Sequence, residues 1–459
     1  MNLRPGSART LLAAVATLSL AAGPHIGTGA AAARPSRPNV LVIVTDDQRK
    51  GTMSVMPQTR SWFRASGVNY TNAWAPTPLC CPARASIFTG QYSHNHLVRN
   101  NDPDQVDNLR QRTTVQYLLH RAGYRTGMVG KYLNHWDLRK PPPYFDTYAV
   151  SNSNRYFDVT WNVNGNLVTH PGYTADFLSR RVLNFVRTAE SPNDDRPWFL
   201  YVATRAPHAP HLPEPRYERT PVPPWDGNPA VFEADRSDKP PHVQADRGKF
   251  WRARRARKGQ LRTLMSVDDF IGDLRSELGR LREKRSTLVF YVSDNGIQWA
   301  EHGVRGKGAA YTASLKVPMF ARWPGHLPAG RVEARLVTHV DITPTILDAA
   351  NVTPDHVVDG RSLLNSSWRR KFMLFEYGNQ LRRSDRPTWA SLRSNGLQYT
   401  EYYDTDERSV VFREYYNLLS DRWQRKNILG DSNLGNDTDV RALAAQLKRY
   451  RQCTGSDCP

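Results

Sequence analysis

The chain has 459 residues, of which 39% are hydrophobic and 23% charged, as in a soluble globular protein. Its length predicts one large domain and a smaller one, and its four cysteines are too few for a disulfide-stabilised scaffold. The formal net charge of +20 favours polyanionic partners such as nucleic acid, anionic lipid or sulfated polymers, or else reflects a solvated, arginine-rich surface.

Residues 1–33 have the pattern of a cleaved export signal. Arg4 and Arg9 precede an apolar run at 11–22, and small residues at 30–33 offer cleavage positions. The run is too short to span a bilayer, and the sequence has no other apolar stretch of about 18 residues. We therefore expect a secreted or extracytoplasmic protein without stable membrane insertion.

After a linker at 34–38, four apolar runs alternate with helical patterns. The runs lie at 39–45, 124–130, 198–203 and 287–293, and the helical patterns at 113–122, 175–190 and 260–281. Continuous β-branched runs are typical of strands that are buried on both faces. The alternation predicts an α/β fold with a large, mainly parallel sheet and helices on both faces.

Polar side chains follow these runs at the point where each strand should end. Asp46 and Asp47 follow the first, Lys131 the second, and Asp294 and Asn295 the fourth. The third run leads into a proline-rich segment, 205–245, that contains His208. Open α/β sheets bind ligands in the crevice beyond the carboxyl ends of their strands, so these residues should meet there.

Two features come from the remaining chain. The segment 251–259 is the densest basic cluster, and it forms either the solvated start of a helix or a contact for polyanions. After about residue 365, the segments 397–403 and 409–418 alternate with a period of two, and a short helix is expected at 440–451. We predict a smaller C-terminal α+β domain, 366–459, with an antiparallel sheet.

The oxygen-donor residues predict a metal site. Asp46, Asp47, Asp294 and Asn295 supply hard oxygen ligands, which favours Ca²⁺, and less strongly Mg²⁺, over zinc. Arg84, Lys131, His208 and Lys307 are cations that could gather at the same crevice and hold a sulfate or phosphate ester. Each residue also has a simpler interpretation, as a turn residue, a packing residue or a solvated cation.

The adjacent cysteines Cys80 and Cys81 allow several interpretations. Cys80 could be a thiolate nucleophile, or it could pair with Cys81, although a disulfide between neighbours is strained. Cys453 and Cys458 suggest a small disulfide loop near the end of the chain.

The segment CCPARASIFTG at 80–90 resembles the signature of the type I sulfatases, Cys-x-Pro-x-Arg followed by an apolar stretch and Thr-Gly. Motifs in family order and spacing also occur at 40–48, 130–131, 207–208, 293–296 and 341–347. The resemblance implies an alkaline-phosphatase-like fold with a catalytic domain at 34–365. It also implies that Cys80 is converted to Cα-formylglycine (3-oxoalanine) by a formylglycine-generating enzyme.

In the mechanism that this resemblance implies, hydrated formylglycine attacks sulfur, expels the alcohol and then releases sulfate. Asp46, Asp47, Asp294 and Asn295 would bind Ca²⁺ together with the modified Cys80. Arg84 would steady the formylglycine. Lys131, His208 and Lys307 would bind sulfate oxygens, with His208 or Lys307 as the acid for the leaving oxygen.

Two positions depart from the family pattern. Ala83 replaces the common serine, and Leu133 stands where many relatives have a histidine. His135, two residues later, is a candidate for the residue that activates the diol. Segments 79–96, 130–134 and 264–270 resemble the N-acetylglucosamine-6-sulfatase branch, which acts on glycosaminoglycans.

The sequence therefore predicts hydrolysis of a sulfate monoester, on a sulfated sugar, a glycosaminoglycan or an aryl sulfate. The partners expected are this substrate and the maturing enzyme, without nucleic acid. One alternative is a related phosphonate or phosphate monoester hydrolase. Another is a non-catalytic protein that binds sulfated glycans through residues 252–257.

Overall fold

A computed structural model of the chain describes residues 37–191, 194–381 and 385–459. The predicted export signal at 1–33 lies outside the described residues. Among the residues that the structure describes, no helix is both long and apolar enough to cross a membrane.

The first apolar run forms β1 (Asn39–Thr45), which is buried along its whole length inside a ten-stranded sheet. It pairs in parallel with β8 (Trp198–Ala203) on one side and β9 (Thr287–Ser293) on the other, and β4 (Arg125–Gly130) extends the parallel region beyond β8. The other strands of this sheet are β2 (Val68–Tyr70), β5 (Thr147–Val150), β6 (Phe157–Val163), β7 (Asn166–Tyr173), β12 (Met319–Arg322) and β13 (Arg331–Glu333). Their order is β13-β2-β12-β9-β1-β8-β4-β5-β6-β7, with the central strands β9 to β5 all parallel.

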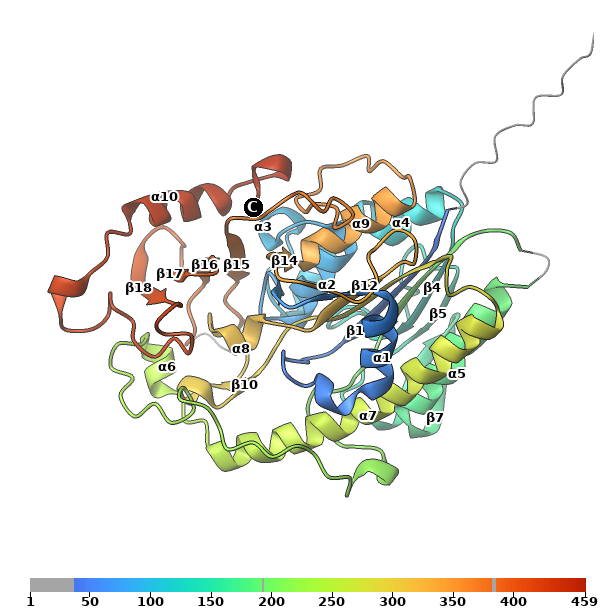
Figure 1. The fold of residues 1–459 in the computed structure, drawn as a ribbon, viewed down its shortest axis with the longest axis horizontal. Helices are drawn as coiled ribbons and strands as arrows, with labels where there is room; N and C mark the ends of the chain where they lie inside the picture. Colours follow the sequence, from blue (N-terminus) through green and yellow to red (C-terminus); the bar gives the residue numbers. More distant parts are fainter. Residues whose placement is uncertain (1–36, 192–193, 382–384) are drawn as a thin grey trace, which may run out of the picture. The chain divides into compact units, whose positions relative to one another are not determined.

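Side chains of β1 alternate between two apolar cores, one on each face of the sheet. Val40, Val42 and Val44 belong to one core, and Leu41 and Ile43 to the other. The first core is covered by α2 (Cys80–Thr89), α4 (Val115–Arg121) and α9 (Ile342–Ala349), and the second by α1 (Pro57–Ser66), α5 (Thr174–Ala189) and α7 (Phe250–Arg280) (Figure 1). The predicted α/β fold, with a large, mainly parallel sheet and helices on both faces, is confirmed.

The C-terminal part contains a second, antiparallel sheet, as predicted. Its strands are β15 (Met373–Tyr377), β16 (Trp389–Arg393), β17 (Leu397–Tyr403) and β18 (Val410–Asn417), and α10 (Arg441–Tyr450) follows. Phe375 and Trp389 share a core with Trp74, whereas Leu392 on the opposite face packs with Leu447 of α10. Residues 37–459 form one compact unit, so the domain boundary at 365 stays a prediction.

The short elements complete the chain. They are β3 (Ala73–Trp74), β10 (Gln298–Trp299), β11 (Arg305–Gly306), β14 (Val337–Thr338), α3 (Ser93–His96), α6 (Pro241–Ala245) and α8 (Thr312–Leu315). The proline-rich segment 205–245 has little regular structure beyond α6 and one 3₁₀ turn, as its composition predicts.

Helix α7 begins ten residues earlier than the predicted start at residue 260. Its first two turns are rich in Ala, Arg and Lys, which favour a helix but lack the apolar periodicity that predicts the rest of α7. Gly259 lies inside the helix because a Cβ at this position would be 2.6 Å from the carbonyl oxygen of His211. The glycine therefore marks a close contact with a neighbouring loop and not a helix start.

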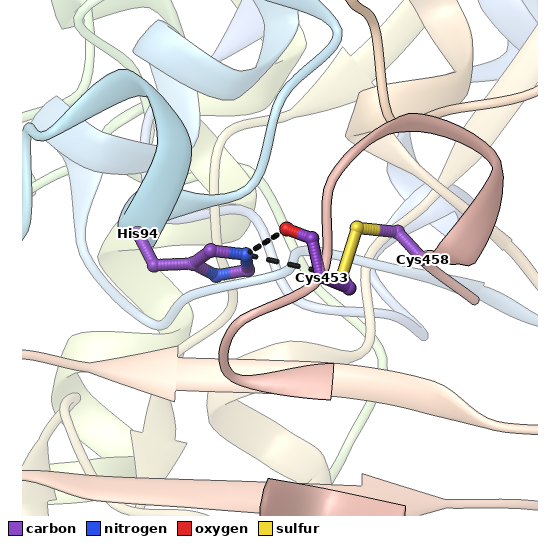
Figure 2. A group of neighbouring side chains, drawn as sticks. All are labelled: His94, Cys453 and Cys458. Atoms are coloured by element: carbon purple, nitrogen blue, oxygen red, sulfur yellow. Dashed lines mark hydrogen bonds between the residues drawn. A yellow bond between two sulfur atoms is a disulfide. The ribbon is translucent and has the colours of Figure 1, made fainter. Parts of the chain in front are cut away.

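The chain ends in a small loop that is closed by the disulfide between Cys453 and Cys458. His94 of α3 holds this loop in place, with Nε2 at 2.8 Å from the carbonyl oxygen of Cys453 (Figure 2). Its other ring nitrogen, Nδ1, lies 2.8 Å from Oε1 of Glu376 on β15. One histidine thus joins three segments that are distant in the sequence.

Candidate active site

The carboxyl ends of β1 and β9 bring four oxygen-donor side chains together, because the two strands are parallel neighbours. The backbone N–H of Asp47 donates to Oδ1 of Asp294 at 3.0 Å, and Nδ2 of Asn295 donates to Oδ1 of Asp47 at 2.7 Å. Donor atoms of Asp46, Asp47, Asp294 and Cys80 all lie within 4.8 Å of one another. Three buried carboxylates in such a space require positive charge to balance them.

Helix α2 directs Cys80 and Arg84 into this cluster. The two residues are one helical turn apart, so both side chains lie on the same face of the helix. Sγ of Cys80 is 3.4 Å from Oδ1 of Asp46, and Nε of Arg84 donates to Oδ2 of Asp294 at 3.0 Å. Cys81 turns instead into the apolar core, and both cysteines are free thiols. The hypothesis of a Cys80–Cys81 disulfide is therefore wrong.

Two lysines and a histidine also surround the carboxylates. Nζ of Lys131, which follows β4, is 2.7 Å from Oδ2 of Asp46. Nζ of Lys307, which follows β11, contacts Oδ1 of Asp47 and lies 2.7 Å from Sγ of Cys80. Nε2 of His208, beyond β8, is 3.7 Å from Oδ2 of Asp47.

The charges shift the pKa values of these groups in opposite directions. Burial alone would raise the pKa of Asp46, but Lys131 and the neighbouring cations hold it well below its usual range. Burial would lower the pKa of Lys307, but the carboxylate of Asp47 raises it above its usual value. Burial, together with Asp46, raises the pKa of the Cys80 thiol. Burial and the nearby carboxylates therefore oppose the thiolate form of an unmodified Cys80.

The donor set fits a hard dication. Asp46, Asp47, Asp294 and Asn295 offer oxygen atoms only, and the ligands that Ca²⁺ and Mg²⁺ prefer are carboxylate and amide oxygens. The ammonium of Lys307 already contacts Asp47 and Cys80 and lies 3.3 Å from Oδ1 of Asn295, so these donors converge on positive charge. The metal and its identity stay a prediction.

One cation of the site, Arg205, was missed in the sequence. It lies two residues beyond β8, with Nη1 3.9 Å from Oδ2 of Asp46. Its Nη2 donates to Nδ1 of His208 at 2.5 Å and to the carbonyl oxygen of Ala209 at 2.8 Å. Nδ1 of His208 also lies 2.8 Å from the carbonyl oxygen of Ala209, so Arg205 and this carbonyl hold the ring with Nε2 toward the cluster.

A cavity of about 480 Å³ opens beside the cluster. Lys131, Arg205 and His208 line it, together with Asn101, Asp102, Asn134, His135, Asn152, Asn154 and Gln380, among others. His135 is exposed at its wall, and its role in activating a diol stays a prediction. The polar amides of this lining were also missed, because they come from separate loops without a common motif.

Carboxylates at the strand ends of a parallel sheet, with four arginine and lysine cations, a histidine and a buried reactive position beside them, fit a hydrolase of anionic esters. Family models identify the particular class. The model described as Sulfatase matches residues 38–352, and the one described as N-sulphoglucosamine sulphohydrolase, C-terminal, matches residues 300–452. The chain belongs to the sulfatase family, as predicted, and is a sulfuric ester hydrolase.

Similar proteins carry sulfatase names. Human N-acetylglucosamine-6-sulfatase is 30% identical, over 100% of this chain and 92% of its own length. The extracellular sulfatase SULF-1 homolog of Drosophila melanogaster is 34% identical over 72% of this chain, but the match spans only 31% of that longer protein. A solved structure of BT4656 in complex with its substrate D-glucosamine-2-N,6-O-disulfate has a TM-score of 0.74 at 22% identity, covering 91% of this chain and 97% of that one. At this identity, the likeness supports the fold alone.

Proposed function

We propose that this sulfatase hydrolyses the sulfate monoester of a sulfated sugar, through a formylglycine made from Cys80. The observation that carries the proposal is the position of Cys80. Its Sγ lies among donor atoms of Asp46, Asp47 and Asp294, and Nζ of Lys307 is 2.7 Å away. A nucleophile at this position would face both the metal ligands and the cations that can hold sulfate oxygens.

The amide-rich cavity supports a sugar as the alcohol part of the ester. Asn134, Asn152 and Asn154 each offer donors and acceptors, which suits the hydroxyl groups of a pyranose. Because the human relative is named N-acetylglucosamine-6-sulfatase, our leading substrate is a 6-sulfated N-acetylglucosamine, free or within a glycosaminoglycan.

The side chains divide the work between charge and orientation. Lys131 and Lys307 place fixed positive charge beside the residue that reacts, and Arg84 fixes that residue against Asp294. His208 would present Nε2 toward the oxygens of the ester, while Arg205 holds its ring. Hydrated formylglycine would supply a hydroxyl nucleophile and a second hydroxyl for sulfate release.

The oxygen cluster would hold Ca²⁺ through Asp46, Asp47, Asp294 and Asn295. The ion would add positive charge where negative charge develops on the ester. Maturation would need a formylglycine-generating enzyme in the same cell. We also propose an extracytoplasmic location, which the name of the Drosophila extracellular sulfatase and the terminal disulfide support.

Mass spectrometry of the peptide that contains residue 80 tests the proposal directly. Conversion of cysteine to formylglycine lowers the peptide mass by about 18 Da. An active protein that retains the unmodified cysteine would contradict this mechanism.

Turnover of nitrophenyl sulfate, nitrophenyl phosphate and phenylphosphonate tests the ester class. We expect the sulfate to be preferred, because the chain belongs to the sulfatase family. A strong preference for a phosphorus ester would support the phosphonate or phosphate hydrolase alternative. Glycan binding without any sulfate release would support the non-catalytic one.

A further inference from the structure

The first turns of α7 carry an exposed basic face that the catalytic site does not use. We define this basic face as Arg252, Arg254, Arg255 and Lys258, which are all exposed. Ala253, Arg257 and Leu261 lie buried on the opposite side of the helix. Trp251, which is 61% exposed, lies beside the basic residues. The basic face therefore contains the cations of this segment that are exposed and can contact a partner.

The charges of the basic face are not balanced within the protein. The sequence has no acidic residue between Asp246 and Asp268. Among the residues that the structure describes, no carboxylate forms an ion pair with any of the four cations, although Arg252 lies 5.0 Å from the ring centroid of Trp251. Like charges that are close on a helix repel one another, and a bound polyanion would relieve this repulsion.

Arg257 has a different role, so it does not belong to the glycan-binding surface at 252–257 that the sequence suggested. Its side chain is buried, and Nη1 donates to the carbonyl oxygen of Pro223 at 2.7 Å. Nε of Arg262 likewise donates to the carbonyl oxygen of Thr220 at 3.0 Å. These arginines fasten the proline-rich loop to α7 and do not form a binding surface.

The same loop links the basic face to the catalytic site. Gly259, next to Lys258, lies in close contact with the backbone of His211. His211 is three residues from His208, and three residues span at most about 11 Å. A polysaccharide that leaves the cavity past His208 can therefore reach the basic face within a few sugar units.

We propose that the basic face binds a sulfated polysaccharide and holds the polymer while one of its sulfate esters occupies the catalytic site. This inference rests on the proposed hydrolysis of sugar sulfates. A sulfated polymer combines repeated negative charges, which match the unpaired cations, with sugar rings that can stack on the exposed indole of Trp251. A free monosaccharide sulfate in the cavity would not extend to these residues.

A charge-reversal variant tests the proposal. Arg252→Glu, Arg255→Glu and Lys258→Glu together remove three exposed cations that form no ion pair. The matched control is Arg60→Glu, Arg64→Glu and Lys448→Glu, which makes the same charge change at exposed positions of α1 and α10. Both variants are compared with the wild type for binding to heparin across a salt series, and for sulfate release from heparin and from nitrophenyl sulfate.

We expect the α7 variant to bind heparin more weakly, with the log–log salt dependence of binding reduced by about three, one for each ion contact. Its KM for heparin should rise at least about fivefold, whereas turnover of nitrophenyl sulfate should stay within about twofold of the wild type. The control variant should retain most of its heparin binding.

Two results would overturn the proposal. One is equal loss of heparin binding in the α7 and control variants, which would show that only net charge matters. The other is wild-type binding to duplex DNA or to phosphatidylserine vesicles as tight as to heparin, which would show no selectivity for the glycan. Because binding is measured without turnover, the absence of sulfate release would contradict the proposed function and not the basic face.

Discussion

Among single residues, the two adjacent cysteines differ most in their surroundings. Cys80 faces the carboxylates and Lys307, whereas Cys81 lies in the apolar core. We predict that Cys80→Ala lowers kcat for nitrophenyl sulfate by at least about a thousandfold, because the reacting group is lost. Thermal unfolding of the variant should show that it still folds, since alanine fits the buried position.

Cys81→Ala is the matched control, with the same chemical change one residue away. It removes a buried sulfur, so it should cost about 1 kcal/mol of stability and leave kcat within about threefold. Comparable loss of turnover in both variants would mean that packing of α2, and not the chemistry of residue 80, explains the effect.

Arg205 acts on the reaction through His208, as a positioning residue. We predict that Arg205→Met lowers kcat by about tenfold to a hundredfold, because the ring of His208 can then rotate away from the cluster. Arg205→Lys should restore part of the rate, since lysine keeps a cationic donor beside the ring. Steady-state kinetics would separate this effect from weaker binding, and a rise in KM alone would assign Arg205 to substrate contact instead.

The difference between His208 and Arg205 shows what sequence can reveal at this scale. His208 lies in a Pro-His pair that recurs in a known family, so its place was expected. Arg205 is one of many arginines in the chain, and its role follows only from the 2.5 Å contact with His208. The sequence does not predict the amides of the cavity for the same reason, since Asn101 and Gln380 meet only after folding.

At the level of elements, α3 and the terminal loop provide a pH-dependent contact. Both ring nitrogens of His94 face acceptors, Glu376 and the carbonyl oxygen of Cys453, so the charged imidazolium is favoured. Burial would lower the pKa of His94, but Glu376 and these hydrogen bonds raise it to about 9. The unfolded chain should have a pKa near 6.5 at this residue.

The sign of the effect follows from these two values. Because the folded pKa is higher, the stabilisation is fully present below about pH 6.5 and is lost as pH rises through about 9, up to about 3 kcal/mol. We predict that the melting temperature of the wild type falls more steeply between pH 7 and 10 than that of His94→Gln. Parallel melting curves for the two proteins would exclude this role.

Elements with a strong pattern were predicted almost to the residue. β1, β8 and β9 have the predicted bounds, because a buried parallel strand has an unbroken apolar run. The hairpin β6–β7 was not predicted, since β7 is largely exposed and contains Pro171. The strands β15 and β16 were also missed, because each is a short, nearly fully buried segment without alternation.

For the whole molecule, the buried carboxylates predict a dependence on metal. We expect that chelation by EDTA lowers both sulfatase activity and melting temperature, because Asp46, Asp47 and Asp294 would then repel one another with less compensation. Ca²⁺ should restore both properties better than Mg²⁺, since it accepts more ligands in less regular geometry. Full activity after exhaustive chelation, verified by elemental analysis, would rule out a metal role.

The overall plan of the molecule was accessible from sequence because strand ends in a parallel sheet share one edge. This rule alone predicts that Asp46, Lys131, His208 and Asp294 meet at one edge of the sheet. It could not predict how the C-terminal sheet packs, since Trp74 and Trp389 lie 315 residues apart and meet in one core only in the folded chain.

The complete burial of α2 has a consequence for the timing of maturation. All ten of its residues are buried, so a modifying enzyme cannot reach Cys80 in the folded protein. Any oxidation of this cysteine must therefore be finished before the helix is enclosed between the sheet and α9. The yield of active protein would then depend on the rate of modification relative to the rate of folding. Slower folding at low temperature should therefore raise the modified fraction.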